Sequence, residues 1–315
     1  MIFSKKLFHK NYYHIKPFIP RALQIHLRRR FILRKRLNCI NIWPINKKAG
    51  KIPQGWPGWP DGKRFALAIT HDVDTSKGFE RCIQLAAIDE FYGFKSSFNF
   101  VAEEYYVSNA IREHLVDQGF EVGLHGLIHK KNPFLNWKTF MNQAARINEY
   151  LIEWNCVGFR CPSMYHNLDW IHQLNIEYDS STFDTDPFEP QPDGMETIFP
   201  FWVSDGSSRG GYVELPYTLP QDYTLFVLMK ERDISIWIKK LDWIAEVGGM
   251  ALVNIHPDYI NFSSKKASIA EYRVGLYRDF FEYVKKKYEF DYWNALPREI
   301  ASFFKSSMVY KDEEI

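Results

Sequence analysis

The sequence predicts an α/β protein in which a mostly parallel sheet closes into a barrel of about seven βα units. Strand-like and helix-like runs alternate from residue 65 to about residue 287, which is typical of parallel sheets covered by helices. Ionisable residues also follow the apolar runs at five separate points. Barrels and open α/β sheets build their active sites at the carboxyl ends of strands, so this placement supports the same fold class.

The predicted elements follow from apolar spacing and from the residues that end each run. The first strand is the apolar run FALAIT (65–70), and the run at residues 79–94 has apolar residues spaced near 3.6, as in a helix. Glycines after two of the runs indicate helix ends. The further predicted strands are SSFNFV (96–101), EVGLHG (121–126), VGFRCP (157–162), EYDSS (177–181), YVELPYTLP (212–220) and ALVNIHP (251–257), and the predicted helices span 79–94, 111–119, 137–154, 168–174, 234–249 and 270–287.

Charge divides the chain into a basic arm and an acidic body. Residues 1–60 contain 14 Lys and Arg and no Asp or Glu, and the rest of the chain has 26 basic and 38 acidic residues. We expect a basic N-terminal arm (1–50), a Pro/Gly/Trp linker (51–63), an α/β domain (64–305) and a C-terminal tail (306–315). The arm either contacts an anionic membrane surface or another polyanion, or packs on the acidic body. Nucleic acid is an unlikely partner in this reading, since no second feature supports it.

Location is predicted from what the sequence lacks. The opening residues have no apolar core of a signal peptide, and no run approaches the roughly 18 apolar residues that span a bilayer. The four cysteines show no C-x-x-C spacing, which favours reduced thiols over a disulfide framework or a cysteine-based zinc site. We therefore expect a cytoplasmic protein, peripheral to the inner membrane face if the arm contacts lipid.

Two aspartates directly after the first strand are the first candidate site residues. Asp72 and Asp74 end the stretch FALAITHDVD, and unpaired carboxylates are costly in a sheet interior. They either cap a turn or share a cation, as D-x-D pairs do in metal-dependent glycosyltransferases.

The histidines supply a more specific signal. His125 and His129 form H-x-x-x-H after another strand, and two imidazoles with one carboxylate make the three-ligand set of a catalytic zinc ion. Arg160 and His256 also follow strands, where an arginine can orient a carboxylate and a histidine can act as a general acid. Each of them alone would more often be an ordinary surface or core residue.

Together these segments resemble the NodB-like polysaccharide deacetylases, carbohydrate esterase family 4. The motifs THDVD, HGLIH, RCP, YDSS and LVNIHP follow the family's order, and the resemblance covers residues 65 to about 260. It implies a distorted (β/α) barrel of the NodB-homology type and metal-dependent removal of an N-acetyl group from an amino sugar.

The resemblance also implies roles for single residues. Asp72 looks like the catalytic base, Arg160 like the residue that orients it, and His256 like the general acid. Asp179, or less plausibly Asp184, looks like the aspartate that tunes the acid histidine.

For the metal, the resemblance implies His125, His129 and an aspartate. The family's usual ligand position would fall on Val73, so we expect Asp74 to replace it, as in a D-x-D variant. The expected ion is Zn²⁺, with Co²⁺, Ni²⁺ or Fe²⁺ as alternatives, because a His/His/Asp site accepts several divalent ions.

The expected substrate is a polysaccharide or a lipid-linked glycan precursor that carries an N-acetylated amino sugar. Pro162, Tyr165 and Trp202 are candidate substrate-binding residues, although core packing is the commoner role of any single aromatic residue. Three alternatives stay open: a D-x-D glycosyltransferase, a metal-free amidohydrolase of the same fold acting on small cyclic amides, and a non-catalytic glycan-binding relative.

Overall fold

Strand β1 (Phe65–Val73) pairs with three other strands in the computed structural model, which describes residues 20–129, 132–207 and 210–309. The sheet has the order β11-β1-β2-β3-β4-β5-β7-β6, and β8 pairs with the other edge of β1. All pairs are parallel except β6 with β7. The other strands are β2 (Ser97–Phe100), β3 (Glu121–Leu124), β4 (Gly158–Phe159), β5 (Tyr178–Asp179), β6 (Phe201–Ser204), β7 (Gly211–Glu214), β8 (Met250–Ile255) and β11 (Tyr292–Asn294), with β9 (Ile260–Asn261) and β10 (Tyr272–Arg273) forming a separate pair.

The sheet closes on itself through irregular backbone. After β7, the amides of Thr218 and Leu219 both donate to the carbonyl of Leu252 in β8, at 3.1 Å each. Pro216 and Pro220 flank this stretch, and proline cannot donate to a sheet ladder, so no regular strand forms here. The predicted distorted (β/α) barrel is therefore confirmed, although the predicted strand 212–220 is regular only as far as Glu214.

Alternation along β1 separates the barrel interior from the helical layer. Ala66 and Ala68 belong to an inner cluster with β8 residues such as Leu252, whereas Phe65 and Ile69 belong to the larger cluster under the helices. Because side chains alternate with a period of two, Thr70 and Asp72 continue the inward face. This places polar groups at the inner carboxyl end of β1.

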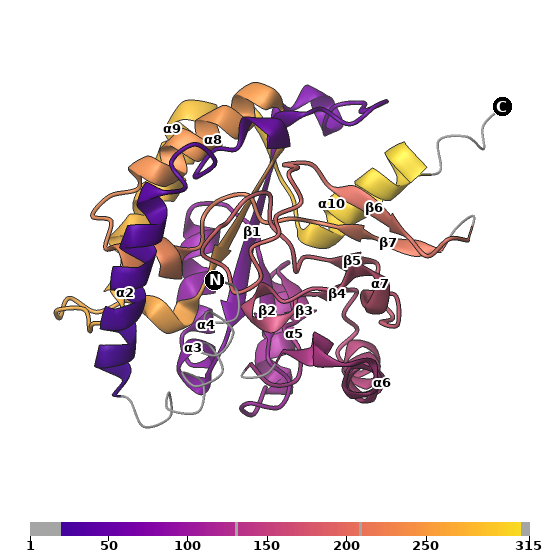
Figure 1. Cartoon of the computed structure of the whole chain (residues 1–315), viewed down its shortest axis with the longest axis horizontal. Coiled ribbons are helices and arrows are strands. Elements are labelled where there is room, and N and C mark those ends of the chain that lie inside the picture. The colour runs from indigo at the N-terminus through magenta and orange to yellow at the C-terminus, as the bar shows by residue number, and fades with distance from the viewer. Residues whose placement is uncertain (1–19, 130–131, 208–209, 310–315) are drawn as a thin grey trace, which may run out of the picture.

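Helices cover the outer face of the sheet and one end of the barrel (Figure 1). Residues 79–94, expected to be one helix, form the end of α3 and all of α4. At the amino ends of the strands, α10 adds Ile300 and Phe304 to the inner cluster. The helices are α2 (Arg21–Leu37), α3 (Ser76–Phe79), α4 (Cys82–Phe91), α5 (Asn109–Asp117), α6 (Trp137–Glu153), α7 (Leu168–Ile171), α8 (Ser235–Val247), α9 (Gly275–Tyr288) and α10 (Pro297–Phe304).

The described part of the basic arm packs on the body. Helix α2 lies beside a π-helical turn, η6 (Tyr223–Met229), as Figure 1 shows for the indigo helix at the left. Its Ile25 and Ile32 are buried, and Arg36 forms an ion pair with Glu231. In the part of the chain that the structure describes, no helix is long and apolar enough to cross a membrane.

Candidate active site

The pleat of β1 decides which residues of THDVD reach the site. Asp72 points into the barrel, and the neighbouring His71 points outward, where its Nε2 lies 2.7 Å from Oδ2 of Asp89. Asp89 also accepts hydrogen bonds from Ser96 and from Tyr277. His71 is therefore part of the packing between sheet and helices and lies outside the site.

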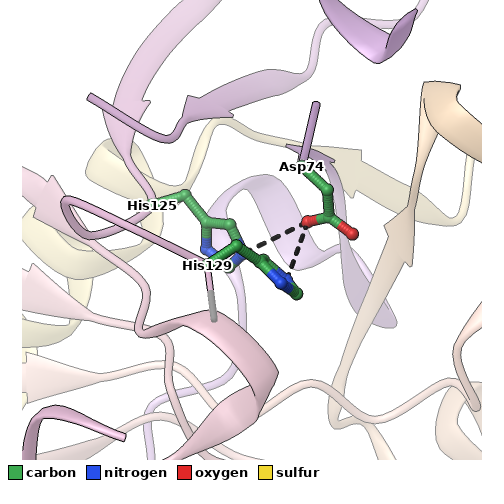
Figure 2. Close-up of side chains that lie close together, drawn as sticks. All are labelled: Asp74, His125 and His129. Carbon is green, nitrogen blue, oxygen red and sulfur yellow. Dashed lines mark ion pairs between the residues drawn. The ribbon is translucent and has the colours of Figure 1, made fainter. Parts of the chain in front are cut away.

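Asp74, His125 and His129 come together at the carboxyl ends of β1 and β3 (Figure 2). Oδ1 of Asp74 lies 3.1 Å from Nε2 of His129 and 3.5 Å from Nε2 of His125. Ligand bonds of about 2.1 Å to one tetrahedral ion would separate two donor atoms by about 3.4 Å. Both distances suit donors that share one divalent ion.

The loop between the two histidines depends on a glycine. Gly126 has a φ of +67°, and a Cβ there would lie 2.7 Å from Cδ of Pro162. Only glycine adopts this conformation at little cost. The chain can therefore turn directly after His125 and bring His129 back over Asp74.

Hydrogen bonding fixes the histidine atom that faces the carboxylates. Nδ1 of His125 lies 3.0 Å from the carbonyl oxygen of Arg160. A carbonyl only accepts, so Nδ1 carries a proton and Nε2 is the ring nitrogen that faces the carboxylates. This outer contact is common for metal-binding histidines.

Asp74 itself is held as a ligand would be. Its Oδ2 accepts from the Tyr259 hydroxyl at 3.2 Å, and its amide donates to Oδ2 of Asp258 at 3.0 Å. Oδ1 is buried and has no hydrogen bond among the described residues. An orphaned buried carboxylate oxygen beside two imidazole nitrogens fits a bound cation.

Electrostatics in this group agree with that fit. Burial raises the pKa of Asp74, but His129 and His125 outweigh it and hold the pKa well below its usual range. The side chain of His129 is 29% exposed, whereas those of Asp74 and His125 are 6% and 2% exposed. The donor set is therefore open to solvent on the His129 side.

Asp72 is surrounded by donors. Its Oδ1 accepts from Asn99 at 2.9 Å and from Arg160 at 3.1 Å, and its Oδ2 accepts from Asn254 at 2.7 Å. Burial raises the pKa of Asp72, but Arg160, His125 and His256 together hold it below its usual range. Asp72 is thus an ionised carboxylate at neutral pH, fixed on both oxygens.

Arg160 is a buried positioning residue. It lies just after β4, and besides Asp72 its guanidinium donates to Ser180, Thr70 and Asn254 at 2.7–3.0 Å. Only 1% of the residue is exposed. Such a fork of donors fixes both the position and the charge of the Asp72 carboxylate.

His256 is paired with an aspartate that the sequence did not reveal. Nδ1 of His256 lies 2.7 Å from Oδ1 of Asp222, and its amide donates to Oδ2 of Asp222 at 2.9 Å. Burial lowers the pKa of His256, but Asp222 more than offsets this and raises it to about 10. His256 is therefore protonated at neutral pH and can donate a proton from Nε2.

The expectation that Asp179 or Asp184 supports His256 is corrected by these contacts. Asp179 is paired in register with the outward-facing Phe159 and bonds to Ser181, so it faces the helical layer. Asp184 forms a buried ion pair with Lys240. Both carboxylates have structural partners.

The candidate substrate-binding residues are not gathered in one place. Pro162 packs against Gly126, beside the loop that carries His129, and Tyr165 is half-buried against the outer core. Trp202 lies in β6, where the Lys305 ammonium is 5.8 Å from its ring. Lys305 directly follows α10, at the amino ends of the strands, so Trp202 is not placed with the metal ligands.

Some of the site residues that were not predicted have a signal in the sequence, and others have none. Asn254 lies on β8 and His256, two positions later, directly follows it, so the period of two already predicted that both face the same side. Asn99 likewise lies opposite Asp72 in the β1–β2 register. Asp222 and Tyr259 lie outside regular strands and had no comparable signal.

Comparisons with known proteins agree with this architecture. No family model and no curated protein matches the chain. A Mycobacterium smegmatis protein with the provisional name polysaccharide deacetylase is 21% identical and has a TM-score of 0.59, over 81% of this chain and 95% of that one. A probable polysaccharide deacetylase from Pseudomonas aeruginosa PAO1 is 15% identical, with a TM-score of 0.62 over 84% and 98% of the two chains. The Puue allantoinase is 13% identical, with a TM-score of 0.64 over 85% and 99%.

These similarities define a class of fold. The protein has the distorted barrel that solved polysaccharide deacetylases and an allantoinase share. At these identities the likeness establishes the fold alone, so the chemistry has to be argued from the site.

Proposed function

We propose that the protein is a metal-dependent hydrolase that removes an N-acetyl group from an amino sugar and releases acetate. One observation carries the proposal: the donor set Asp74, His125 and His129 lies beside an ionised Asp72, and a protonated His256 is near enough to lower the pKa of both aspartates. Amide hydrolysis needs a polarised carbonyl, a proton acceptor for the attacking water and a proton donor for the leaving nitrogen.

Asp74, His125 and His129 would hold the metal. A divalent ion bound there supplies a Lewis acid for the acetyl carbonyl and lowers the pKa of water, so that a weakly basic carboxylate can accept its proton. Asp72 is the proton acceptor, because it lies next to the donor set, with Oδ2 3.9 Å from Nε2 of His125. Arg160, Asn99 and Asn254 keep it in place and ionised.

His256 serves the leaving group. Because Asp222 holds Nδ1 and its proton, Nε2 is free to donate to the amine as the carbon–nitrogen bond breaks. Asp222 never needs to lose or gain a proton in this step, so it is a positioning residue. The acid directly follows β8 and the base lies on β1, and these two strands pair directly in the sheet.

The substrate class rests on the fold and on the sequence motifs. Solved proteins of this fold are named as polysaccharide deacetylases, which supports a glycan bearing an N-acetylated amino sugar. We propose Zn²⁺ as the ion, with Co²⁺, Ni²⁺ or Fe²⁺ as functional replacements, since availability often decides among them. A lipid-linked glycan precursor inside the cell is the form of substrate that we would test after soluble chito-oligosaccharides.

The test compares metal content and acetate release in four proteins. Wild type is expected to bind near-stoichiometric metal and to release acetate from N-acetylated oligosaccharides. The His125→Ala/His129→Ala variant is expected to lose both. The Asp72→Asn variant should keep the metal and lose acetate release. A matched control, His26→Ala/His114→Ala, replaces two exposed histidines outside the site.

The alternatives predict different results. Amide hydrolysis without metal, unchanged by His125→Ala/His129→Ala, would instead support a metal-free amidohydrolase. Transfer from a nucleotide sugar without acetate release would support a glycosyltransferase, in which Arg160 and His256 have no evident role. Metal and glycan binding with no turnover would leave a binding protein.

A further inference from the structure

Helix α2 has a second apolar face, which points away from the body. Leu23, Leu27 and Phe31 are 48%, 43% and 61% exposed, and their spacing of four residues puts them on one side of the helix. The opposite side holds Ile25 and Ile32, which are buried against the body. The helix therefore packs on the body through one stripe and presents another to solvent.

The outward face also carries positive charge. Arg30 and Arg34 are exposed on the same side of the helix as Leu23, Leu27 and Phe31. Leu37 and Ile40, both 76% exposed, extend the apolar surface beyond these residues. The arginines of the packed side are already engaged: Arg29 donates to the carbonyls of Val227 and Ile269. Residues 1–60 contain no acidic side chain that could neutralise this surface.

We propose that this outward face of α2, formed by Leu23, Leu27, Arg30, Phe31 and Arg34, docks on an anionic phospholipid membrane. Large apolar side chains interleaved with arginines suit the boundary between lipid headgroups and acyl chains. A second copy of the chain is disfavoured as the occupant, because it would bring two arginine-rich faces together. RNA would use the charges but would leave the exposed leucines without a partner.

The side of α2 that packs on the body lies near the candidate active site. The guanidinium of Arg28 lies 5.5 Å from the ring centroid of Tyr223, which in turn lies 4.5 Å from the ring centroid of Tyr259. Tyr259 donates to Asp74. Two aromatic side chains thus separate the packed side of the helix from the candidate metal ligand Asp74.

The test measures vesicle binding of the full chain and does not depend on hydrolytic activity. Wild type is expected to co-sediment with vesicles of phosphatidylcholine and phosphatidylglycerol, and much less with phosphatidylcholine alone. Leu27→Ser/Phe31→Ser should bind about tenfold more weakly, because two apolar side chains no longer enter the lipid. Arg30→Gln/Arg34→Gln should lose about fivefold per charge at low salt. Phe290→Ser, which replaces a 78% exposed phenylalanine elsewhere, is the matched control.

Several results would overturn the proposal. The proposal would be wrong if wild type did not bind anionic vesicles. It would also be wrong if Leu27→Ser/Phe31→Ser bound them as tightly as wild type, because the membrane contact would then lie outside α2. A wild-type dimer that this variant dissociates, without vesicle binding, would assign the face to a second copy. Binding to polyuridine without vesicle binding would assign it to RNA. Circular dichroism of each variant checks that the exposed substitutions leave the fold intact.

Discussion

Replacing Asp222 with asparagine separates the charge of the Asp222–His256 pair from its shape. The side-chain oxygen of asparagine can still accept from the amide of His256 and from the Tyr272 hydroxyl, which Oδ2 of Asp222 does at 2.9 and 2.8 Å. The amide nitrogen would face Nδ1 of His256, so the ring must hold its proton on Nε2 and stay neutral. We therefore expect a folded protein with an altered histidine.

The size of the change follows from the pKa of His256. Burial lowers the pKa of His256, but Asp222 foremost, with smaller contributions from Asp74 and Asp72, raises it to about 10 from an ordinary value of 6.5. The Asp222→Asn variant should therefore titrate His256 up to about three pH units lower. A raised histidine pKa stabilises the folded state fully below pH 6.5 and loses that contribution as the pH rises through about 10. The stability deficit of the variant should shrink over this range.

Two assays read this out. Nuclear magnetic resonance titration of the His256 ring in chelator-treated protein gives the pKa directly, with His256→Gln assigning the signal. In metal-loaded protein, the alkaline limb of acetate release should move to lower pH in Asp222→Asn. Asp233→Asn, which alters an exposed aspartate beside Ser235, controls for the substitution. A His256 pKa that stays within about one unit of wild type would refute the reasoning, as would an activity loss that is equal at every pH.

Three further predictions use other parts of the structure. Burial raises the pKa of Glu121 from 4.5 to about 7, so the free energy of unfolding should fall by up to about 3 kcal/mol as the pH rises between these values. Denaturant titrations of Glu121→Gln should lack this fall. The same pH dependence of the unfolding free energy in wild type and variant would contradict the prediction. Arg160→Lys should cost about 3 kcal/mol of stability and most activity, because lysine cannot make the planar set of contacts around Asp72; a chemical denaturation midpoint like that of wild type would exclude this. Tyr259→Phe removes the donor to Asp74 and should weaken metal binding by about tenfold in chelator competition, whereas Tyr223→Phe should not; equal affinities in the two variants would argue against a role for that hydroxyl.

The parts of the site that could be predicted from sequence are those fixed by strand ends. Asp72, His125, Arg160 and His256 each follow an apolar run, and parallel strands bring their carboxyl ends to one edge. Neither the chain separation nor the loops between them had to be known. The fold class could be predicted for the same reason, because the prediction requires only the local periodicity of the apolar residues and the order of strands and helices along the chain.

The remainder depends on contacts that local patterns do not encode. Asp222 reaches His256 from a stretch between Pro220 and the π-helical turn η6, which has no strand or helix period. The role predicted for Asp179 was wrong because its motif fixes only its order along the chain. Its orientation depends on the strand register, which pairs Asp179 with Phe159 and turns its side chain outward. The basic character of the arm was visible in sequence, but which of the arginines of α2 contact the body became clear only from the packing.

Arg160 contacts two residues of the site. Its side chain donates to the proposed base, Asp72, and its backbone carbonyl accepts from Nδ1 of His125. A small shift of the backbone after β4 would therefore change the basicity of the carboxylate and the direction of the imidazole lone pair together. Under the proposed function, we therefore expect substitutions that change ion preference and substitutions that change pH dependence to show non-additive effects with each other.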